Sequence, residues 1–135
     1  MDLDKALRIS AAGMAAQSTR LRVVAENLAN RDSTGESPGA EPYRRRTVSF
    51  AERLERETGT RAVAVSRVAG APGEFPRHYD PSHPAADATG YVKTPNVDSL
   101  IEVMDMREAQ RSYSANLSVL ETTRGMLTRA IEALR

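Results

Sequence analysis

The chain has no cysteine and no tryptophan, and its 135 residues include only four tyrosines and two phenylalanines. Without cysteine it can form neither a disulfide nor a thiolate that acts as nucleophile or metal ligand. The small number of aromatic side chains also leaves little bulk for a deep core. These absences exclude disulfide-stapled scaffolds and cysteine-dependent enzymes.

Neither sign of charge dominates, because 19 Lys and Arg stand against 18 Asp and Glu. Proteins whose main partner is a nucleic acid usually carry a basic excess, so we expect no nucleic-acid partner. No apolar run approaches the roughly 20 residues that span a bilayer. The first turn is charged where a signal peptide would be apolar. The sequence therefore predicts a protein without direct membrane insertion and without a cleaved leader.

Apolar residues recur at alternating spacings of four and three near both ends of the chain. This spacing places each set on one stripe of a helix, and so narrow a stripe needs a partner helix to cover it. The C-terminal stripe is the longer one, so pairing within one chain would leave some of it uncovered. We expect the two stripes to form an assembly interface: Leu3, Leu7, Met14, Leu21, Val24 and Leu28, and then Val103, Met106, Tyr113, Leu117, Leu120, Leu127, Ile131 and Leu134.

Polar residues interrupt both stripes at Gln17, Gln110 and Arg124. Buried polar groups select among helix pairings at some cost in stability, so we expect these three to set the register. Small side chains surround Gly13, and a patch of this kind lets another helix approach closely. The stripes are also typical of an ordinary folded bundle.

The pattern divides the chain into three parts. Residues 1–30 are expected to form an N-terminal coiled-coil helix, residues 31–95 a loop and a small β-rich segment, and residues 96–135 a C-terminal coiled-coil helix. Asp2 or Asp4 can cap the first helix. Asn96, Asp98 or Ser99 can cap the last helix, and Ser99 with Glu102 has the spacing of a capping box.

Within the middle segment, alternating apolar residues predict strands at Tyr43–Phe50 and Arg61–Val68. Shorter strands are expected at Phe75–Tyr79 and Tyr91–Lys93, and a short helical turn at Ala51–Thr58. The predicted fold class is mostly α with a small β insertion. Its long N- and C-terminal helices form an α-helical coiled-coil layer, and its middle is a β-ribbon or extended segment.

Two groups of residues contain side chains of the kinds that bind ligands. His78, Asp80, His83 and Asp87 lie in one loop, but their spacing matches no zinc or calcium motif, so turn residues are expected rather than a metal site. The run Arg44–Arg46 suits a solvated or subunit-contacting strand face better than a phosphate site. No nucleophile elbow or paired catalytic motif is present in the sequence. We therefore expect no cofactor, no metal and no enzymatic activity.

Several stretches are similar to the signatures of bacterial flagellar rod and hook proteins. Gly13–Gln17 and Val23–Asn30 resemble the N-terminal signature, and Arg111–Leu117 resembles the C-terminal pattern. The block Tyr79–Val97 resembles that of the short proteins of the proximal rod. The signature residues are Gly13, Asn27, Leu28, Asn30, Tyr113 and Asn116.

The resemblance implies a structural subunit of the flagellar basal-body rod, which spans the periplasm. Such subunits pass through the flagellar type III export apparatus and assemble helically with themselves and other rod subunits. Their terminal helices form the inner layer around the export channel, and the middle segment lies outside. One departure is an insertion at Glu36–Pro42, which delays the expected aromatic residue to Tyr43. The alternative function is a self-contained helical-hairpin adaptor that binds another partner helix.

Overall fold

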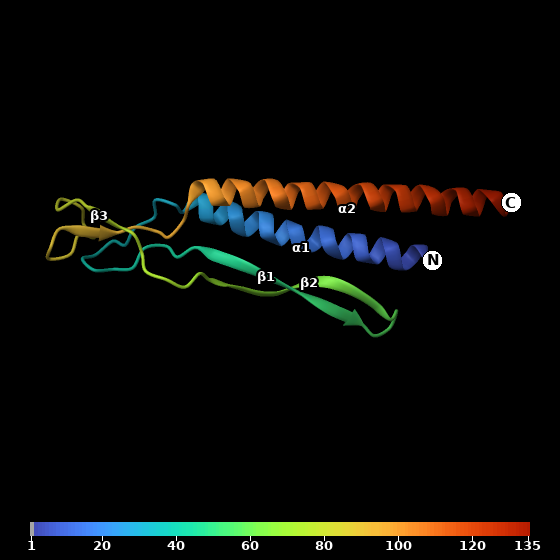
Figure 1. Ribbon diagram of the computed structural model, residues 1–135, viewed down its shortest axis with the longest axis horizontal. Helices are drawn as coiled ribbons and strands as arrows, with labels where there is room; N and C mark the ends of the chain where they lie inside the picture. Colours follow the sequence, from blue (N-terminus) through green and yellow to red (C-terminus); the bar gives the residue numbers. More distant parts are fainter. Residues whose placement is uncertain (1) are drawn as a thin grey trace. The chain divides into compact units, whose positions relative to one another are not determined.

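The computed structural model describes residues 2–135. Two long helices enclose four strands in chain order (Figure 1). The elements are α1 (Leu3–Ala29), β1 (Arg46–Glu55), β2 (Thr60–Gly70), β3 (Arg77–Tyr79), β4 (Tyr91–Lys93) and α2 (Ser99–Ala133). The strands form two separate two-stranded sheets, β1–β2 and β3–β4. The predicted fold class, mostly α with a small β insertion, is confirmed.

A side chain caps the N-terminus of each helix. The Asp2 carboxylate accepts the backbone N–H of Asp4 at 3.0 Å, and the Asp98 carboxylate accepts that of Leu100 at 2.9 Å. The predicted capping box of Ser99 and Glu102 is wrong. Glu102 is fully buried, and its carboxylate accepts a hydrogen bond from Asn27 instead. The side chain that caps the first backbone N–H groups of α2 is therefore that of Asp98.

The strands β1 and β2 form one long hairpin. Its turn closes where the Gly59 N–H donates to the Glu55 carbonyl at 2.9 Å, with Gly59 at a positive φ of 66°. The helical turn predicted at Ala51–Thr58 is wrong, because β1 continues through Glu55. Pairing with β2 overrides the weak local preference of this charged stretch for a helix.

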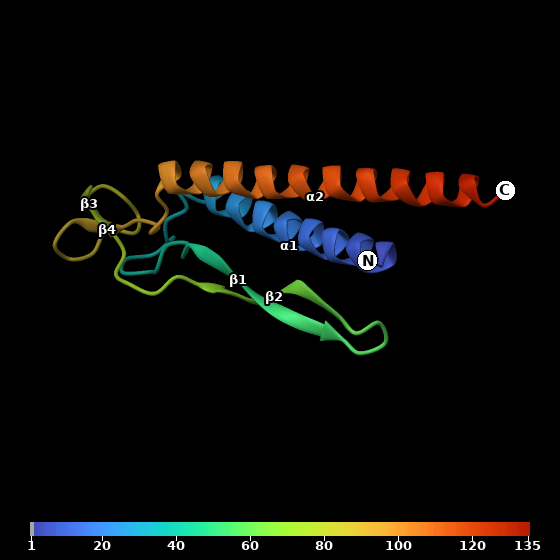
Figure 2. The same cartoon turned by 45° about the vertical axis from the view of Figure 1, so that its right-hand side comes forward.

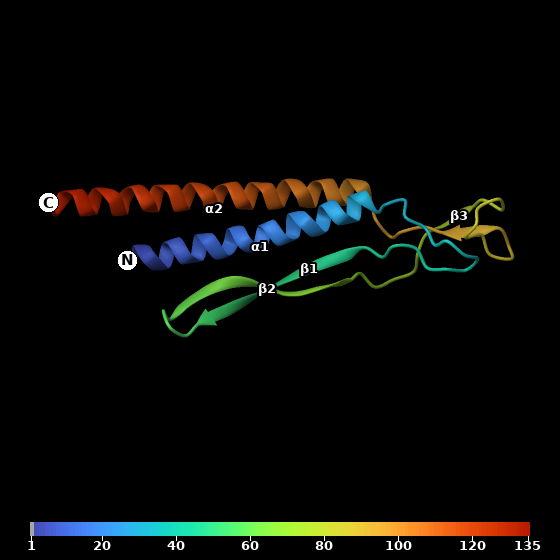
Figure 3. The same cartoon turned by 180° about the vertical axis from the view of Figure 1, so that it is seen from behind.

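The chain folds as two compact units, which we describe separately. The first contains residues up to Leu21, Val48–Arg67 and Arg107–Arg135. Within it α1 packs antiparallel to α2, and the β1–β2 hairpin lies alongside α1 (Figures 1, 2 and 3). Its buried apolar residues are small: Ala16 and Ala109.

The second unit contains Arg22–Thr47 and Val68–Met106. Its strands β3 and β4 pair antiparallel, with Tyr79 opposite Tyr91 and their rings in edge contact at 5.3 Å between centroids. The buried apolar residues here are Val23, Val24, Ala85 and Val92. No helix within residues 2–135 is both long and apolar enough to cross a membrane.

Candidate assembly surfaces

The sheltered side of α2 carries small and polar residues rather than large apolar ones. They recur at seven-residue steps: Glu102, Ala109, Asn116 and Thr123. Glu102, Ala109 and Thr123 are buried, and Asn116 is half-buried. The helix pair is therefore built on a heptad of small or polar residues, which the apolar stripes alone did not reveal.

In the first unit, α1 and α2 approach closely at Gly13. A Cβ atom at Gly13 would lie only 2.8 Å from the Nδ2 atom of Asn116. Asn116 is held in place because its Nδ2 donates to the Ser112 carbonyl at 3.0 Å. The close approach predicted from the small residues around Gly13 is confirmed.

Part of each predicted stripe remains accessible in the subunit. Val24 is buried, while Leu3, Leu7, Met14, Leu21, Leu28, Met106, Tyr113 and Leu120 are half-buried. Val103, Leu117, Leu127, Ile131 and Leu134 are exposed. Gln110 and Arg124 are exposed as well, so within the subunit they do not set the register.

The end of α2 extends past the start of α1 and has no cover in the first unit (Figures 1 and 3). Thr123 is the last buried residue of α2, and every residue from Met126 onward is exposed. The exposed fractions of Leu127, Ile131 and Leu134 are 38%, 53% and 88%. We call residues Met126–Leu134 the overhang. Its apolar side chains follow the helical spacing that covers one side of α2.

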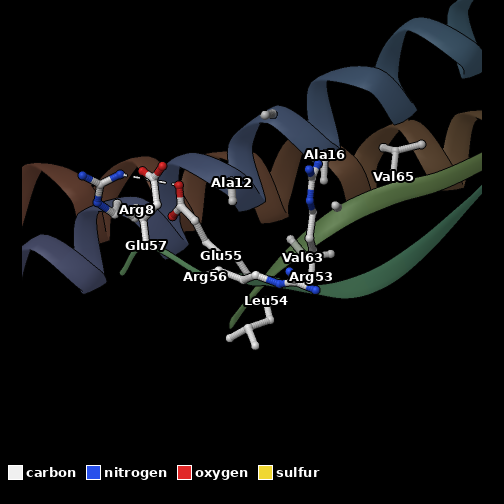
Figure 4. A pocket seen from close by; sticks show the side chains of 13 residues that line it. Arg8, Ala12, Ala16, Arg53, Leu54, Glu55, Arg56, Glu57, Val63 and Val65 are labelled. Atoms are coloured by element: carbon white, nitrogen blue, oxygen red, sulfur yellow. Dashed lines mark ion pairs between the residues drawn. The ribbon is translucent and has the colours of Figure 1, made fainter. Parts of the chain in front are cut away.

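A groove of about 1070 Å³ lies between α1 and the β1–β2 hairpin. Ala12, Ala15 and Ala16 of α1 form one wall, and the hairpin supplies Val63 and Val65 on the other (Figure 4). At one end Arg8 reaches Glu55, with 3.8 Å between the charged atoms. The groove is thus lined both by small apolar side chains and by charged ones, namely Arg8, Arg53, Glu55, Arg56 and Glu57.

In the second unit, a cluster of polar side chains joins both helices to the segment between α1 and β1. We call it the polar clasp, and its members are Asn27, Tyr43, Arg45, Arg46 and Glu102. Asn27 and Glu102 are 1% and 0% exposed. The Asn27 Nδ2 donates to the Arg46 carbonyl at 2.9 Å and to Glu102 Oε2 at 3.2 Å.

The remaining groups of the polar clasp are also paired. The Asn27 Oδ1 accepts the Tyr43 hydroxyl at 2.7 Å and the Arg46 N–H at 3.0 Å. The guanidinium of Arg45 donates to Glu102 Oε1 and, at 3.2 Å, to Asp105. Burial, reinforced by the negative charge of Glu26, raises the pKa of the Tyr43 phenol above its ordinary value of 10.0.

The arginine run makes intramolecular contacts rather than a free charged face. The Arg44 guanidinium lies 4.2 Å from the centre of the Phe75 ring and donates to the carbonyls of Ala71 and Gly73 at 2.8 and 3.0 Å. The Arg46 guanidinium pairs with Glu26 at 3.1 Å. The run is therefore only partly a solvated strand face, because Arg44 and Arg45 are half-buried and Arg46, the first residue of β1, is exposed. Contact of this face with another subunit stays a prediction.

The loop that carries His78 and His83 uses its acidic groups in turns. Asp80 accepts the N–H and hydroxyl of Ser82, and these bonds lower the pKa of its carboxyl group. His83 Nδ1 accepts the Ala85 N–H at 3.0 Å, and its Nε2 lies 3.3 Å from the Thr34 hydroxyl. Among residues 2–135, no three His, Asp or Glu side chains gather closely enough to hold a metal ion.

The structure also gives the signature residues physical roles. Asn27 holds the polar clasp, Gly13 and Asn116 meet where the helices approach, and Asn30 closes α1 by donating to the Glu26 carbonyl at 2.8 Å. Sequence reasoning missed Arg45 and Glu102. A signal was present for Glu102, because it begins the heptad that continues through Ala109 and Asn116.

Comparison with known proteins identifies two matching families and several close relatives. Residues 7–35 match the family described as flagella basal body rod protein, and residues 88–133 match the C-terminal region of flagellar basal body rod FlgEFG proteins. The chain is 50% identical to the flagellar basal-body rod protein FlgC of Agrobacterium fabrum, over 98% of this chain and 96% of that protein. Identity to the FlgC proteins of Salmonella typhimurium and Bacillus subtilis is 42% and 38%, over at least 91% of each chain.

Proposed function

This chain belongs to the family of bacterial flagellar basal-body rod proteins, and we propose that it is a subunit of the proximal rod. It assembles helically with copies of itself and with other rod subunits into the drive shaft that transmits torque. Identity of 38% or more to three FlgC proteins, over nearly the whole chain, supports this assignment. Structural assembly, rather than catalysis, is the function.

The observation that carries the assembly mechanism is the overhang of α2. Leu127, Ile131 and Leu134 are exposed in the subunit although each is large and apolar. Full burial of one such side chain stabilises an interface by about 1.5–3 kcal/mol. We propose that a neighbouring subunit covers the overhang, as a helix of the coiled-coil layer.

In this proposal, different parts of the chain form different layers of the rod. Residues 1–30 and 96–135 form the inner coiled-coil layer around the export channel, and residues 31–95 form the outer part. The exposed apolar residues near the start of α2, Leu100, Ile101, Val103 and Met104, are a second contact surface for rod neighbours. The groove between α1 and the hairpin has about the volume of two helical turns, so it can receive a neighbour's helix.

We further propose that the subunit reaches the rod through the flagellar type III export apparatus, which makes that apparatus its transient partner. A thin core of small residues suits a chain that passes through a narrow channel before it folds. The absence of cysteine means that no disulfide forms between export and assembly. Its final location is the basal body.

The test is recovery of the chain in hook–basal-body particles purified with detergent and high salt and analysed by mass spectrometry. Stoichiometric recovery of the wild-type chain is expected. Leu127→Asp and Ile131→Asp should abolish recovery and motility, because a buried unpaired charge costs several kcal/mol. The matched control is Thr122→Asp, which places the same charge on the opposite side of α2, nine residues from Ile131.

Absence of the wild-type chain from the particles, with the protein abundant in the cytosol, would support the helical-hairpin adaptor instead. Normal recovery of both overhang variants would place the assembly contact elsewhere on the subunit.

A further inference from the structure

We propose that the polar clasp sets the register of α1 against α2, with Asn27 and Glu102 as the residues that determine it. This role acts inside one chain, so it goes beyond the contacts between rod subunits. It also replaces Gln110 and Arg124, which are exposed in the subunit, as the polar residues that choose the helix pairing. In the observed register every polar group of Asn27 has a partner, and the rest of the helix contact restricts the register less strictly.

The clasp is complete in the observed register. Asn27 is buried, and all of its hydrogen-bonding groups are used, two by donation from Nδ2 and two by acceptance at Oδ1. The Glu102 carboxylate is shared between Asn27 and Arg45. A buried amide and a buried carboxylate are stable only with such partners, so they favour the one alignment that supplies them.

The rest of the contact depends on shape and restricts the register less strictly than the clasp does. Gly13 faces Asn116 in the structure. A shift of seven residues along α2 would bring either Ala109 or Thr123 to Gly13, and both side chains are small. The same shift places Asn116 level with Ala6 or Arg20, whose side chains take the place of the open space at Gly13. Shape at the close approach therefore disfavours the displaced registers but does not exclude them, because Asn116 can move.

The polar clasp distinguishes the registers more strictly. A displacement in one direction brings Ala109 to Asn27, and an alanine side chain cannot accept a hydrogen bond. The opposite displacement moves Glu102 toward Arg20 and leaves Asn27 level with Pro95, which lies before α2 begins. In both cases Asn27 loses its carboxylate partner and Arg45 loses Glu102.

The clasp also links the segment between α1 and β1 to the register of the two helices. Tyr43 and Arg46 bond to Asn27, and the Arg45 N–H donates to Asn96 Oδ1 at 2.7 Å. The residues between α1 and β1 therefore become ordered only when the two helix ends are aligned. Alignment and docking of this segment form one cooperative step.

The experiment uses the absence of cysteine in the full chain. Ser18→Cys and Thr122→Cys, both exposed, provide sites for two nitroxide labels whose separation is measured by pulsed electron spin resonance. Displacement by one heptad moves one helix along the other by about 10 Å. The wild-type clasp should give one narrow distance. Glu102→Gln, which keeps the shape and the acceptor for Asn27, should give the same distance.

The decisive variant is Asn27→Leu with Glu102→Leu, because it removes the buried amide and the buried carboxylate together, while Arg45 keeps Asp105 as a partner. We expect it to remain helical by circular dichroism and to show a second, separate label distance in at least a tenth of the molecules. A transplanted carboxylate, Glu102→Ala with Ala109→Glu, should shift the main distance to the displaced value.

Three outcomes would overturn the proposal. One is that the double leucine variant shows only the label distance of the wild-type chain. Another is a broad distribution in the wild-type chain, and the third is loss of helicity in every clasp variant, which would make the clasp a stabilising element without a register role. This experiment does not measure recovery in hook–basal-body particles. A negative result would therefore overturn the register proposal without testing the rod function, which mass spectrometry tests separately.

Discussion

The two helices meet in different ways in the two units. In the first unit the contact at Gly13 and Asn116 depends on the absence of a side chain. In the second, the contact at Asn27 and Glu102 depends on four polar groups meeting their partners. Both contacts use positions of the same heptad on α2. The comparison shows that one helix pair can combine a contact that fits by shape with one that requires specific partners.

The difference has an energetic consequence. A close approach between small residues contributes through packing and tolerates modest change. A buried carboxylate is costly unless it is paired, so its loss affects the second unit more strongly. Four substitutions would test this contrast, from the largest expected effect to the smallest.

Removing the clasp carboxylate should have the largest effect. Glu102→Ala leaves Asn27 and Arg45 without their shared acceptor, and we expect the free energy of unfolding to fall by about 3–5 kcal/mol. Urea unfolding followed by circular dichroism measures this loss. Glu108→Ala is the control, because Glu108 is exposed on the same helix. Equal stability of the two variants would mean that the buried pair contributes nothing net.

Filling the close approach should have a smaller effect. Gly13→Ala forces Asn116 to move and endangers its bond to Ser112, which should cost about 1–2 kcal/mol after the gain in helix propensity. Gly125→Ala is the matched control, since a Cβ there meets no atom within 4 Å. It should stabilise the chain by up to about 1 kcal/mol. If both glycines respond alike in thermal unfolding, the helices are not closely packed at Gly13.

Removing one hydrogen bond from the clasp should cost about 0.5–1.5 kcal/mol. Tyr43→Phe deletes the hydroxyl that donates to Asn27. Because the folded pKa of Tyr43 is raised, its contribution is fully present below pH 10 and is lost as the pH rises through the folded value. Wild type should therefore lose stability at alkaline pH more steeply than Tyr43→Phe in urea titrations above pH 10.

Changing the overhang should have the smallest effect on the isolated subunit. Leu127→Ser removes no intramolecular packing of note, so its free energy of unfolding should stay within about 0.5 kcal/mol of wild type. The half-buried Leu120, changed in the same way, should cost more. Only the overhang variant should combine normal stability with poor recovery in hook–basal-body particles. A large stability loss in Leu127→Ser would show that the overhang is covered within the subunit.

Much of the fold was accessible from the sequence for clear physical reasons. Long apolar periodicity predicted both helices, and alternation predicted strands at Arg61–Val68 and Tyr91–Lys93, which form β2 and β4. The helical turn predicted at Ala51–Thr58 failed because strand pairing extends β1 through Glu55. The capping box failed because Glu102 had a stronger partner far away in the sequence. Local patterns do not contain such distant competitors.

By itself the sequence determined the class of fold, the close approach at Gly13 and membership in the rod family, because periodicity, small residues and signature motifs are local properties. Only the tertiary structure decided which side of α2 faces α1. It placed Glu102, Ala109 and Thr123 inside and left Leu127 and Ile131 exposed. It also brought Arg45 to Glu102 across 57 residues. Burial removes water as an alternative partner, and which polar groups then meet depends on the path of the whole chain.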